Sequence, residues 1–329
     1  MKVYISFIIA ALFIFSGCST KEYFTPETQG DDWDKIAFLD ENIITTTGTG
    51  ALLENGQILT KEGIQEYLLP EGFNYIGQSG GWFIAAKVDG TLLLHSVDGS
   101  DLKRLELKKT VAAATIQDDT LAVLFANNAM ALYSVSSGAL LFRESANAPV
   151  AVDSRIVNPH FLNELVLFLT LDGKIVIINS DTKQVLRSML ISSEDNFNNI
   201  IYFNLIDNIM VAATSTRLFA LSESERREKY DLRDALYTDE GIWITTKEGE
   251  VIALTPSLQL KAKRKYPFAH FLGMIMTEDK IYILEKQGYM IVLSKDLSVS
   301  EVHELNLDDG YVFVGDKAFY VNDIIYPVE

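Results

Sequence analysis

Short apolar runs separated by turn residues fill most of the chain, in a unit that recurs about every forty residues. In the clearest copy, an apolar strand at Leu165–Thr170 leads through Leu-Asp-Gly into a second strand at Lys174–Asn179, and an amphipathic strand follows at Lys183–Leu190. Asp-Gly between alternating apolar runs indicates a hairpin, because glycine supplies the positive φ of such turns. The unit is therefore predicted to be a small antiparallel sheet.

The repeat occurs eight times along the chain. The second strand of each copy is expected to begin near Asn42, Trp82, Thr120, Glu164, Asn208, Gly241, Asp279 and Lys317. This spacing suits four-stranded blades arranged in a ring and is too strand-rich for helical repeats. We predict an all-β, eight-bladed β-propeller of four-stranded antiparallel blades, forming one domain over residues 36–329.

An inner strand is expected between successive copies, and Val150–Val157 is the candidate before the fourth copy. The last copy offers strands near Tyr311–Val314, Lys317–Val321 and Ile324–Val328, one short of a full blade. A ring without open edges requires the N-terminal segment to pair there, and Glu22–Thr25 is the candidate. The alternative is that the last blade stays three-stranded.

The first residues have the pattern of an export signal. Lys2 precedes an apolar run, Val3–Phe15, and small residues then lead into Cys18, the only cysteine. The run is shorter than the ~20 residues of a membrane-spanning helix. We predict a bacterial lipoprotein signal peptide over 1–17, lipid such as palmitate on Cys18 and a tether over 18–35; the alternative is an uncleaved anchor helix.

Net charge restricts the partners. Loss of Lys2 with the signal peptide leaves 27 Lys and Arg against 45 Asp and Glu, a formal charge of −18. Nucleic acid is excluded as a partner because so acidic a chain is repelled by phosphate. Membrane attachment is expected through the acyl chains on Cys18. Ser19 stands where enteric inner-membrane lipoproteins carry aspartate, which favours the outer membrane, facing the periplasm, over the inner membrane.

The chemistry of catalysis has little basis in this sequence. Asp31-Asp32-Asp34 and Asp308-Asp309 lack the alternating spacing of a calcium loop, and no histidine pair has zinc-ligand spacing. The four histidines are scattered, at His95, His160, His270 and His303. We expect no enzyme activity, no metal, no cofactor and no small-molecule substrate.

Candidate partner-binding residues lie on predicted outermost strands and in one loop. The basic residues of two neighbouring blades are Arg226 and Arg227 in one and Lys261, Lys263, Arg264 and Lys265 in the next. They form either a docking stripe for an acidic partner or charged edges that prevent aggregation. His160 lies in Asn158–Asn163, the longest loop between an inner strand and its neighbour, although Asn158-Pro159 also makes an ordinary turn.

The repeat resembles the pyrroloquinoline-quinone-like (PQQ-like) propeller repeat. Leu171–Met189 and Asn127–Glu144 match it best, with Phe142 and Leu186 in the region where a tryptophan usually closes the repeat. Eight such repeats behind a lipoprotein signal resemble the BamB-type lipoproteins, scaffold subunits of the outer-membrane barrel-assembly machinery. The resemblance implies a lipid-anchored scaffold that assists outer-membrane protein assembly, with an assembly component as its partner. An envelope ligand-binding or sensor propeller and a degenerate quinoprotein-type enzyme are the alternatives.

Overall fold

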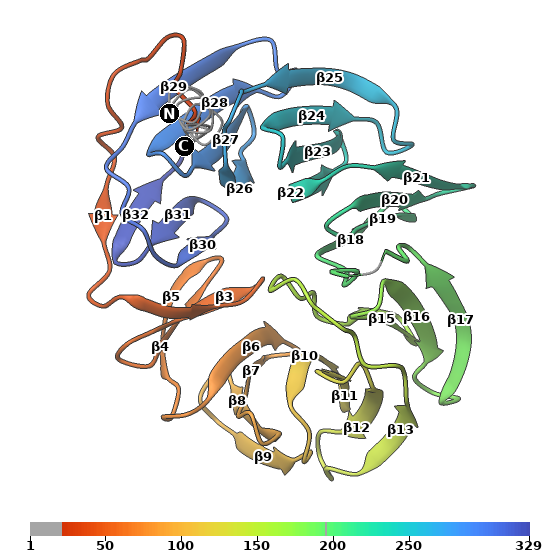
Figure 1. The fold of residues 1–329 in the computed structure, drawn as a ribbon. Helices are drawn as coiled ribbons and strands as arrows, with labels where there is room; N and C mark the ends of the chain where they lie inside the picture. Colours follow the sequence, from red (N-terminus) through yellow and green to blue (C-terminus); the bar gives the residue numbers. More distant parts are fainter. Residues whose placement is uncertain (1–21, 195) are drawn as a thin grey trace, which may run out of the picture.

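The computed structural model describes residues 22–194 and 196–329. The predicted signal peptide and Cys18 lie outside the described residues. Within them the strands form eight four-stranded antiparallel sheets, arranged as blades around a ring (Figure 1). The predicted eight-bladed β-propeller is confirmed.

Blades 1 to 7 each run from an inner strand to an outer strand in chain order, and blade 8 takes its outer strand from the N-terminal part of the chain. Blade 1 comprises β2 (Ile43–Thr46), β3 (Gly50–Leu53), β4 (Gln57–Thr60) and β5 (Gly63–Leu68), and blade 2 comprises β6 (Asn74–Ser79), β7 (Trp82–Ala86), β8 (Thr91–Ser96) and β9 (Leu102–Glu106). Blade 3 comprises β10 (Val111–Gln117), β11 (Thr120–Phe125), β12 (Met130–Ser134) and β13 (Leu140–Glu144), and blade 4 comprises β14 (His160–Leu162), β15 (Leu165–Leu169), β16 (Lys174–Asn179) and β17 (Gln184–Leu190). Blade 5 comprises β18 (Tyr202–Ile206), β19 (Ile209–Ala213), β20 (Arg217–Leu221) and β21 (Glu225–Lys229), and blade 6 comprises β22 (Leu232–Thr238), β23 (Gly241–Thr246), β24 (Glu250–Leu254) and β25 (Leu260–Lys265). Blade 7 comprises β26 (Phe271–Met276), β27 (Lys280–Glu285), β28 (Tyr289–Ser294) and β29 (Ser300–Glu304), and blade 8 comprises β30 (Val312–Val314), β31 (Ala318–Val321), β32 (Ile324–Pro327) and β1 (Ala37–Phe38).

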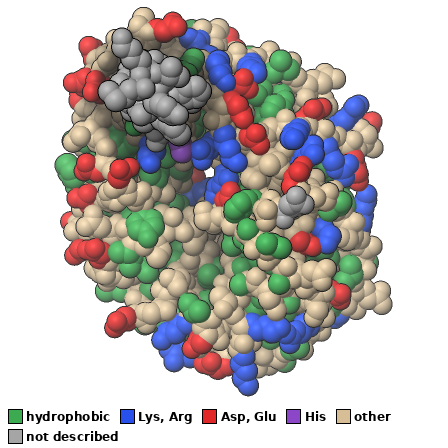
Figure 2. Space-filling model, viewed as in Figure 1, with side chains coloured by type: hydrophobic (Ala, Val, Ile, Leu, Met, Phe, Trp, Pro, Cys, Tyr) green, Lys and Arg blue, Asp and Glu red, His purple; other side chains and the backbone are tan. Residues whose placement is uncertain are grey.

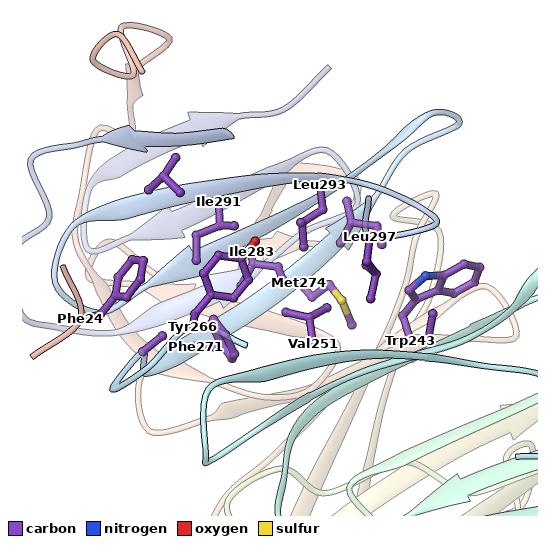
Figure 3. Close-up of a cluster of buried hydrophobic side chains, with 14 residues drawn as sticks. Phe24, Trp243, Val251, Tyr266, Phe271, Met274, Ile283, Ile291, Leu293 and Leu297 are labelled. Atoms are coloured by element: carbon purple, nitrogen blue, oxygen red, sulfur yellow. The ribbon is translucent and has the colours of Figure 1, made fainter. Parts of the chain in front are cut away.

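The apolar core lies between neighbouring blades. Middle strands such as β23 are buried on both faces, whereas the outer strand β21 is exposed throughout. Figure 3 shows the cluster between blades 6 and 7, with Phe24 at one end and Trp243 at the other. Trp243 is 1% exposed, and its indole N–H donates to the carbonyl of Lys295 at 2.9 Å. Burial of side chains of this size stabilises the ring blade by blade, at ~25 cal/mol per Å² of apolar surface.

The N-terminal segment closes the ring, but at a different place from the predicted one. β1 pairs antiparallel with β32, with Ala37 opposite Ile325, and completes blade 8. The prediction of Glu22–Thr25 as the closing strand is wrong. Phe24 is instead 4% exposed and packs edge-on against Tyr266 and Tyr289. An aromatic side chain that enters a core between blades holds its backbone away from the edge of blade 8.

Residues 22–36, which we name the N-terminal strap, follow the outer edge of blade 7. The amide of Gly30 donates to the carbonyl of Val302 at 2.8 Å, and that of Trp33 donates to Glu304 at 2.7 Å. Figure 1 shows the strap passing outside β29 before it reaches β1. Most of the predicted tether is therefore packed on the ring, where it covers part of an outer strand edge.

Two strand assignments from the sequence were wrong. The inner strand of blade 4 is β14, and Val150–Val157 lies in the connection that precedes it. The tight turn at Asn163, with φ 51°, fixes Leu162 opposite Leu165, so only the residues next to that turn can pair with β15. In the first copy, the strand after Asn42 is the inner strand β2 and not the second strand.

Candidate binding surface around the ring centre

A long connection crosses the centre of the ring. Residues 145–159, which we name the crossing segment, join β13 to β14, and Figure 1 shows this yellow-green connection reaching towards β3. At one end, Asn158 accepts from the amide of Ala114 at 3.2 Å and donates to the carbonyl of Ile76 at 3.4 Å. Three residues earlier in the chain, the guanidinium of Arg155 donates to the carbonyl of Arg233. Ile76 and Arg233 belong to blades 2 and 6, which stand opposite each other in a ring of eight.

Both of these carbonyls belong to β-bulges. In blades 2 and 6 the pairing between the inner strand and its neighbour shifts by one residue, at Ile76 and at Arg233 respectively. A bulged residue is left out of the ladder of hydrogen bonds, so its carbonyl is free to accept from elsewhere. The bulges therefore supply the two attachment points of the crossing segment.

Buried asparagines hold the rest of the crossing segment. Asn199, which is fully buried, accepts from the amide of Asp153 at 2.7 Å and donates to the carbonyls of Asp153 and Arg155 at 3.1 and 3.0 Å. Asn128, also fully buried, donates to the carbonyl of Asn147 at 3.2 Å. Backbone N–H and C=O groups of this irregular loop thus find side-chain hydrogen-bond partners, as buried peptide groups require.

Charged side chains gather at this end of the ring. Arg155 binds Asp153 with both Nε at 2.9 Å and Nη2 at 2.5 Å. Burial acts to raise the pKa of Asp153, but the bonds and charge of Arg155 outweigh it and leave that pKa lowered. Figure 2 shows Lys and Arg side chains beside the central hollow. This end of the ring therefore carries positive charge on an otherwise acidic chain.

A shallow, open pocket lies on the same end of the ring, at blade 6 and the connection to blade 7. It has a volume of about 350 Å³ and is lined by Lys247, Glu248, Lys265, Pro267, Phe268, Ala269 and His270. The connection from blade 6 to blade 7 is held in place by Glu285. Its buried carboxylate accepts a hydrogen bond from the backbone amide of His270 at 2.8 Å. Burial raises the pKa of the Glu285 carboxyl.

The predicted basic residues lie on outer strands, as expected, and most of them contact their own ring. Arg227 on β21 donates to the carbonyl of Leu190 in blade 4 and to Glu225, both at 3.0 Å. Its neighbour Arg226 is exposed. These contacts tie blades 4 and 5 together, and a partner-binding role for Arg226 and Arg227 stays a prediction.

The basic residues of β25 behave similarly. Lys263 and Lys265 lie 2.7 and 3.6 Å from the carboxylate of Glu250. Arg264 donates to the carbonyl of Leu297 in blade 7 at 3.1 Å, and Lys261 donates to that of Glu240 at 3.1 Å. The stripe therefore bridges blades 6 and 7, and only part of its charge is left for a partner.

His160 is the first residue of β14, so its predicted place in a loop was wrong. Its ring packs against Phe203 in blade 5 with centroids 5.2 Å apart. Burial lowers the pKa of the imidazole. These surroundings give His160 a packing role between blades, and partner binding by this residue stays a prediction.

The lowered pKa of His160 predicts a pH dependence of stability. Below about pH 6.5 the unfolded chain takes up a proton that the folded imidazole refuses, so stability falls as pH drops from there through the folded pKa. His160→Gln cannot titrate and is expected to weaken this dependence. Thermal unfolding midpoints at neutral and mildly acidic pH would measure it; equal slopes for both proteins would contradict the assignment.

Sequence reasoning missed the crossing segment and the residues around it. Pro149 and Pro159 bracket an apolar stretch that also contains Asp153 and Arg155, and both prolines argue against a strand there. The adjacent charges of Arg233 and Asp234 interrupt an inner strand that also carries Leu232, Ala235 and Leu236, a pattern that pointed to an unusual position.

Two general features of the described residues concern metals and membranes. Nowhere in residues 22–194 and 196–329 do three His, Cys, Asp or Glu side chains group as metal ligands would. The same stretches hold no helix of the length and apolarity needed to cross a bilayer.

Comparison with known proteins places the chain by fold and by sequence. No family model matches it. The plasminogen-binding protein PgbB of Helicobacter pylori, from strains J99 and 26695, is 27% identical over 332 residues, covering 86% of this chain and 61% of PgbB. The chain thus spans less than two thirds of the length of these curated relatives.

Solved structures share the architecture at low sequence identity. BamB from Moraxella catarrhalis superposes with a TM-score of 0.68 and 14% identity, over 91% of this chain and 98% of that one. The C-terminal WD40 domain of Sif2 superposes with a TM-score of 0.66 and 12% identity, over 92% and 100%. The chain is a β-propeller of BamB-like fold.

Proposed function

We propose that this chain is a lipid-anchored scaffold of the outer membrane that faces the periplasm, binds a protein partner and assists outer-membrane protein assembly as BamB-type lipoproteins do. It acts by binding and not by catalysis. The observation that carries the proposal is the crossing segment, which is hydrogen-bonded to the inner strands of two opposite blades, 2 and 6. A ring braced in this way presents a rigid end surface, and rigid surfaces lose less conformational freedom when they bind a partner.

A second candidate function is binding of plasminogen. The relatives that carry this name align with 86% of this chain at 27% identity. Because the alignment leaves over a third of those relatives unmatched, plasminogen binding depends on whether the shared propeller carries the site.

Identification of the partner tests the proposal. Chemical cross-linking in intact cells, gentle detergent extraction and mass spectrometry of what co-purifies should recover an outer-membrane barrel protein or an assembly component. Immobilised plasminogen offered to the same purified protein tests the second candidate. Plasminogen capture without any envelope partner would replace the first function by the second.

Anchoring through Cys18 gives a separate prediction. Cys18→Ala is expected to abolish labelling by a radioactive fatty acid and to release the protein from the membrane, because no other thiol can carry the lipid. The thermal unfolding midpoint should not change, since the described ring begins its packing at Phe24. Continued labelling of the variant would contradict this assignment.

A further inference from the structure

Arg233 carries a charge that the residues at the equivalent position in other blades lack. The inner strands of blades 1, 2, 3, 6 and 7 each carry a bulge at one residue. The bulged residues are Ile44, Ile76, Ala112, Arg233 and Leu272. A bulge redirects a side chain out of the regular ladder and recurs beside functional sites. Among these five bulged residues, Arg233 of blade 6 is the only charged one.

Within the described residues, Arg233 forms no ion pair at 4 Å or less, and the carboxylates of Asp153 and Glu248 act on its charge only from a distance. Its Nε is buried without a hydrogen-bond partner. The neighbouring Arg155 is committed to Asp153 and to the carbonyl of Arg233, so Asp153 is already neutralised. Burial, and next the charge of Arg155, lower the pKa of Arg233, and the carboxylates of Asp153 and Glu248 oppose this shift without reversing it. A partly buried guanidinium with an unsatisfied N–H is costly, and a ligand anion in direct contact would offset that cost.

Lys247 and Phe268 continue the surface outward from Arg233. Lys247 begins the turn after β23, where its amide donates to the carbonyl of Asp231 at 2.7 Å, and its side chain is exposed. Phe268 lines the same pocket, is 58% exposed and has φ 64°. A bulky residue in the left-handed region is strained, by roughly 1–2 kcal/mol. The ring of Phe268 is exposed to solvent on this strained turn, and it is therefore available to contact an apolar group of a ligand.

We propose that Arg233, Lys247 and Phe268 form a binding site for an acidic peptide segment of the partner protein. Arg233 takes a carboxylate through its planar guanidinium, Lys247 adds a second positive charge, and Phe268 contacts a neighbouring apolar side chain. Glu248 also lines the pocket, and its negative charge disfavours a dianionic phosphate there. This inference rests on the proposed function as a protein-binding propeller.

Fluorescence anisotropy with a labelled synthetic peptide tests the site. The probe contains Glu and Phe alternating with Ser, and the matched control peptide has Gln in place of every Glu. Arg233→Gln is expected to weaken binding of the Glu peptide about tenfold or more, because a charge-assisted bidentate contact is lost. Lys247→Gln and Phe268→Ala should each weaken it severalfold. Arg143→Gln, which makes the same substitution at an exposed position of the outer strand β13, should leave the affinity unchanged.

Each other result overturns the assignment. Equal binding of the Glu and Gln peptides, or an affinity that Arg233→Gln does not change, would remove the carboxylate site. Displacement of the peptide by an equal concentration of inorganic phosphate would assign the surface to a phosphate group. The cross-linking experiment separates this failure from that of the function: if Arg233→Gln still recovers the partner seen with wild type, only the site is wrong.

Discussion

Removal of Ile324–Glu329 is expected to lower the thermal unfolding midpoint by more than ~10 °C or to prevent folding. β32 lies between β31 and β1, so its loss opens blade 8 on both sides. It also removes the side chain of Tyr326, which is 1% exposed, and that of Val328. Deletion of buried groups of this size costs about 3–5 kcal/mol for an aromatic side chain alone. Differential scanning calorimetry of the full chain and of a chain ending at Asp323 measures the effect.

Two N-terminal truncations serve as controls for this result. A chain that begins at Ala37 keeps β1 but loses the N-terminal strap, whereas one that begins at Leu39 loses β1 as well. The difference between them isolates the contribution of the closing strand from that of Phe24 and the other strap residues. A solenoid that stays open tolerates the loss of a terminal strand, so an unchanged midpoint after C-terminal truncation would rule out closure through β32.

Asn199→Ala is expected to cost about 3 kcal/mol in the free energy of unfolding. The substitution removes three hydrogen bonds and leaves the amide and carbonyl of Asp153 and the carbonyl of Arg155 without their partner. The crossing segment should then become mobile, since its attachment near blade 5 is lost. Chemical denaturation measures the first effect, and amide hydrogen exchange over residues 153–158 measures the second.

Asn147→Ala is the matched control because it makes the same chemical change within the crossing segment. The side chain of Asn147 is exposed, and the residue is held through its carbonyl, which the substitution keeps. We expect a change within ~0.5 kcal/mol. If Asn199→Ala and Asn147→Ala had equal effects, the crossing segment would not depend on the buried asparagine.

The blades could be predicted from the sequence because the pattern that specifies each hairpin lies within a short stretch of the chain. Alternating apolar residues and a turn such as Leu171-Asp172-Gly173 specify a hairpin within about ten residues, whatever the rest of the chain does. Repetition of that unit then fixed the number of blades, and the amphipathic last strand of each unit fixed which strand lies outermost. The basic residues of β21 and β25 were placed correctly for this reason.

The contacts that join distant parts of the ring were decided by tertiary structure. Phe24 belongs to the segment expected to pair as an edge strand, but its ring packs in a core against Tyr266 and Tyr289, which lie 242 and 265 positions further along the chain. Its burial therefore overrode strand pairing. Val150–Val157 is largely apolar, like a buried strand, yet its polar residues bond to other parts of the ring. Arg155 donates to the carbonyl of Arg233, which lies 78 positions away. Local pattern determines which segments can become strands. Packing around a closed ring determines which of them do, because only there do the competing partners meet.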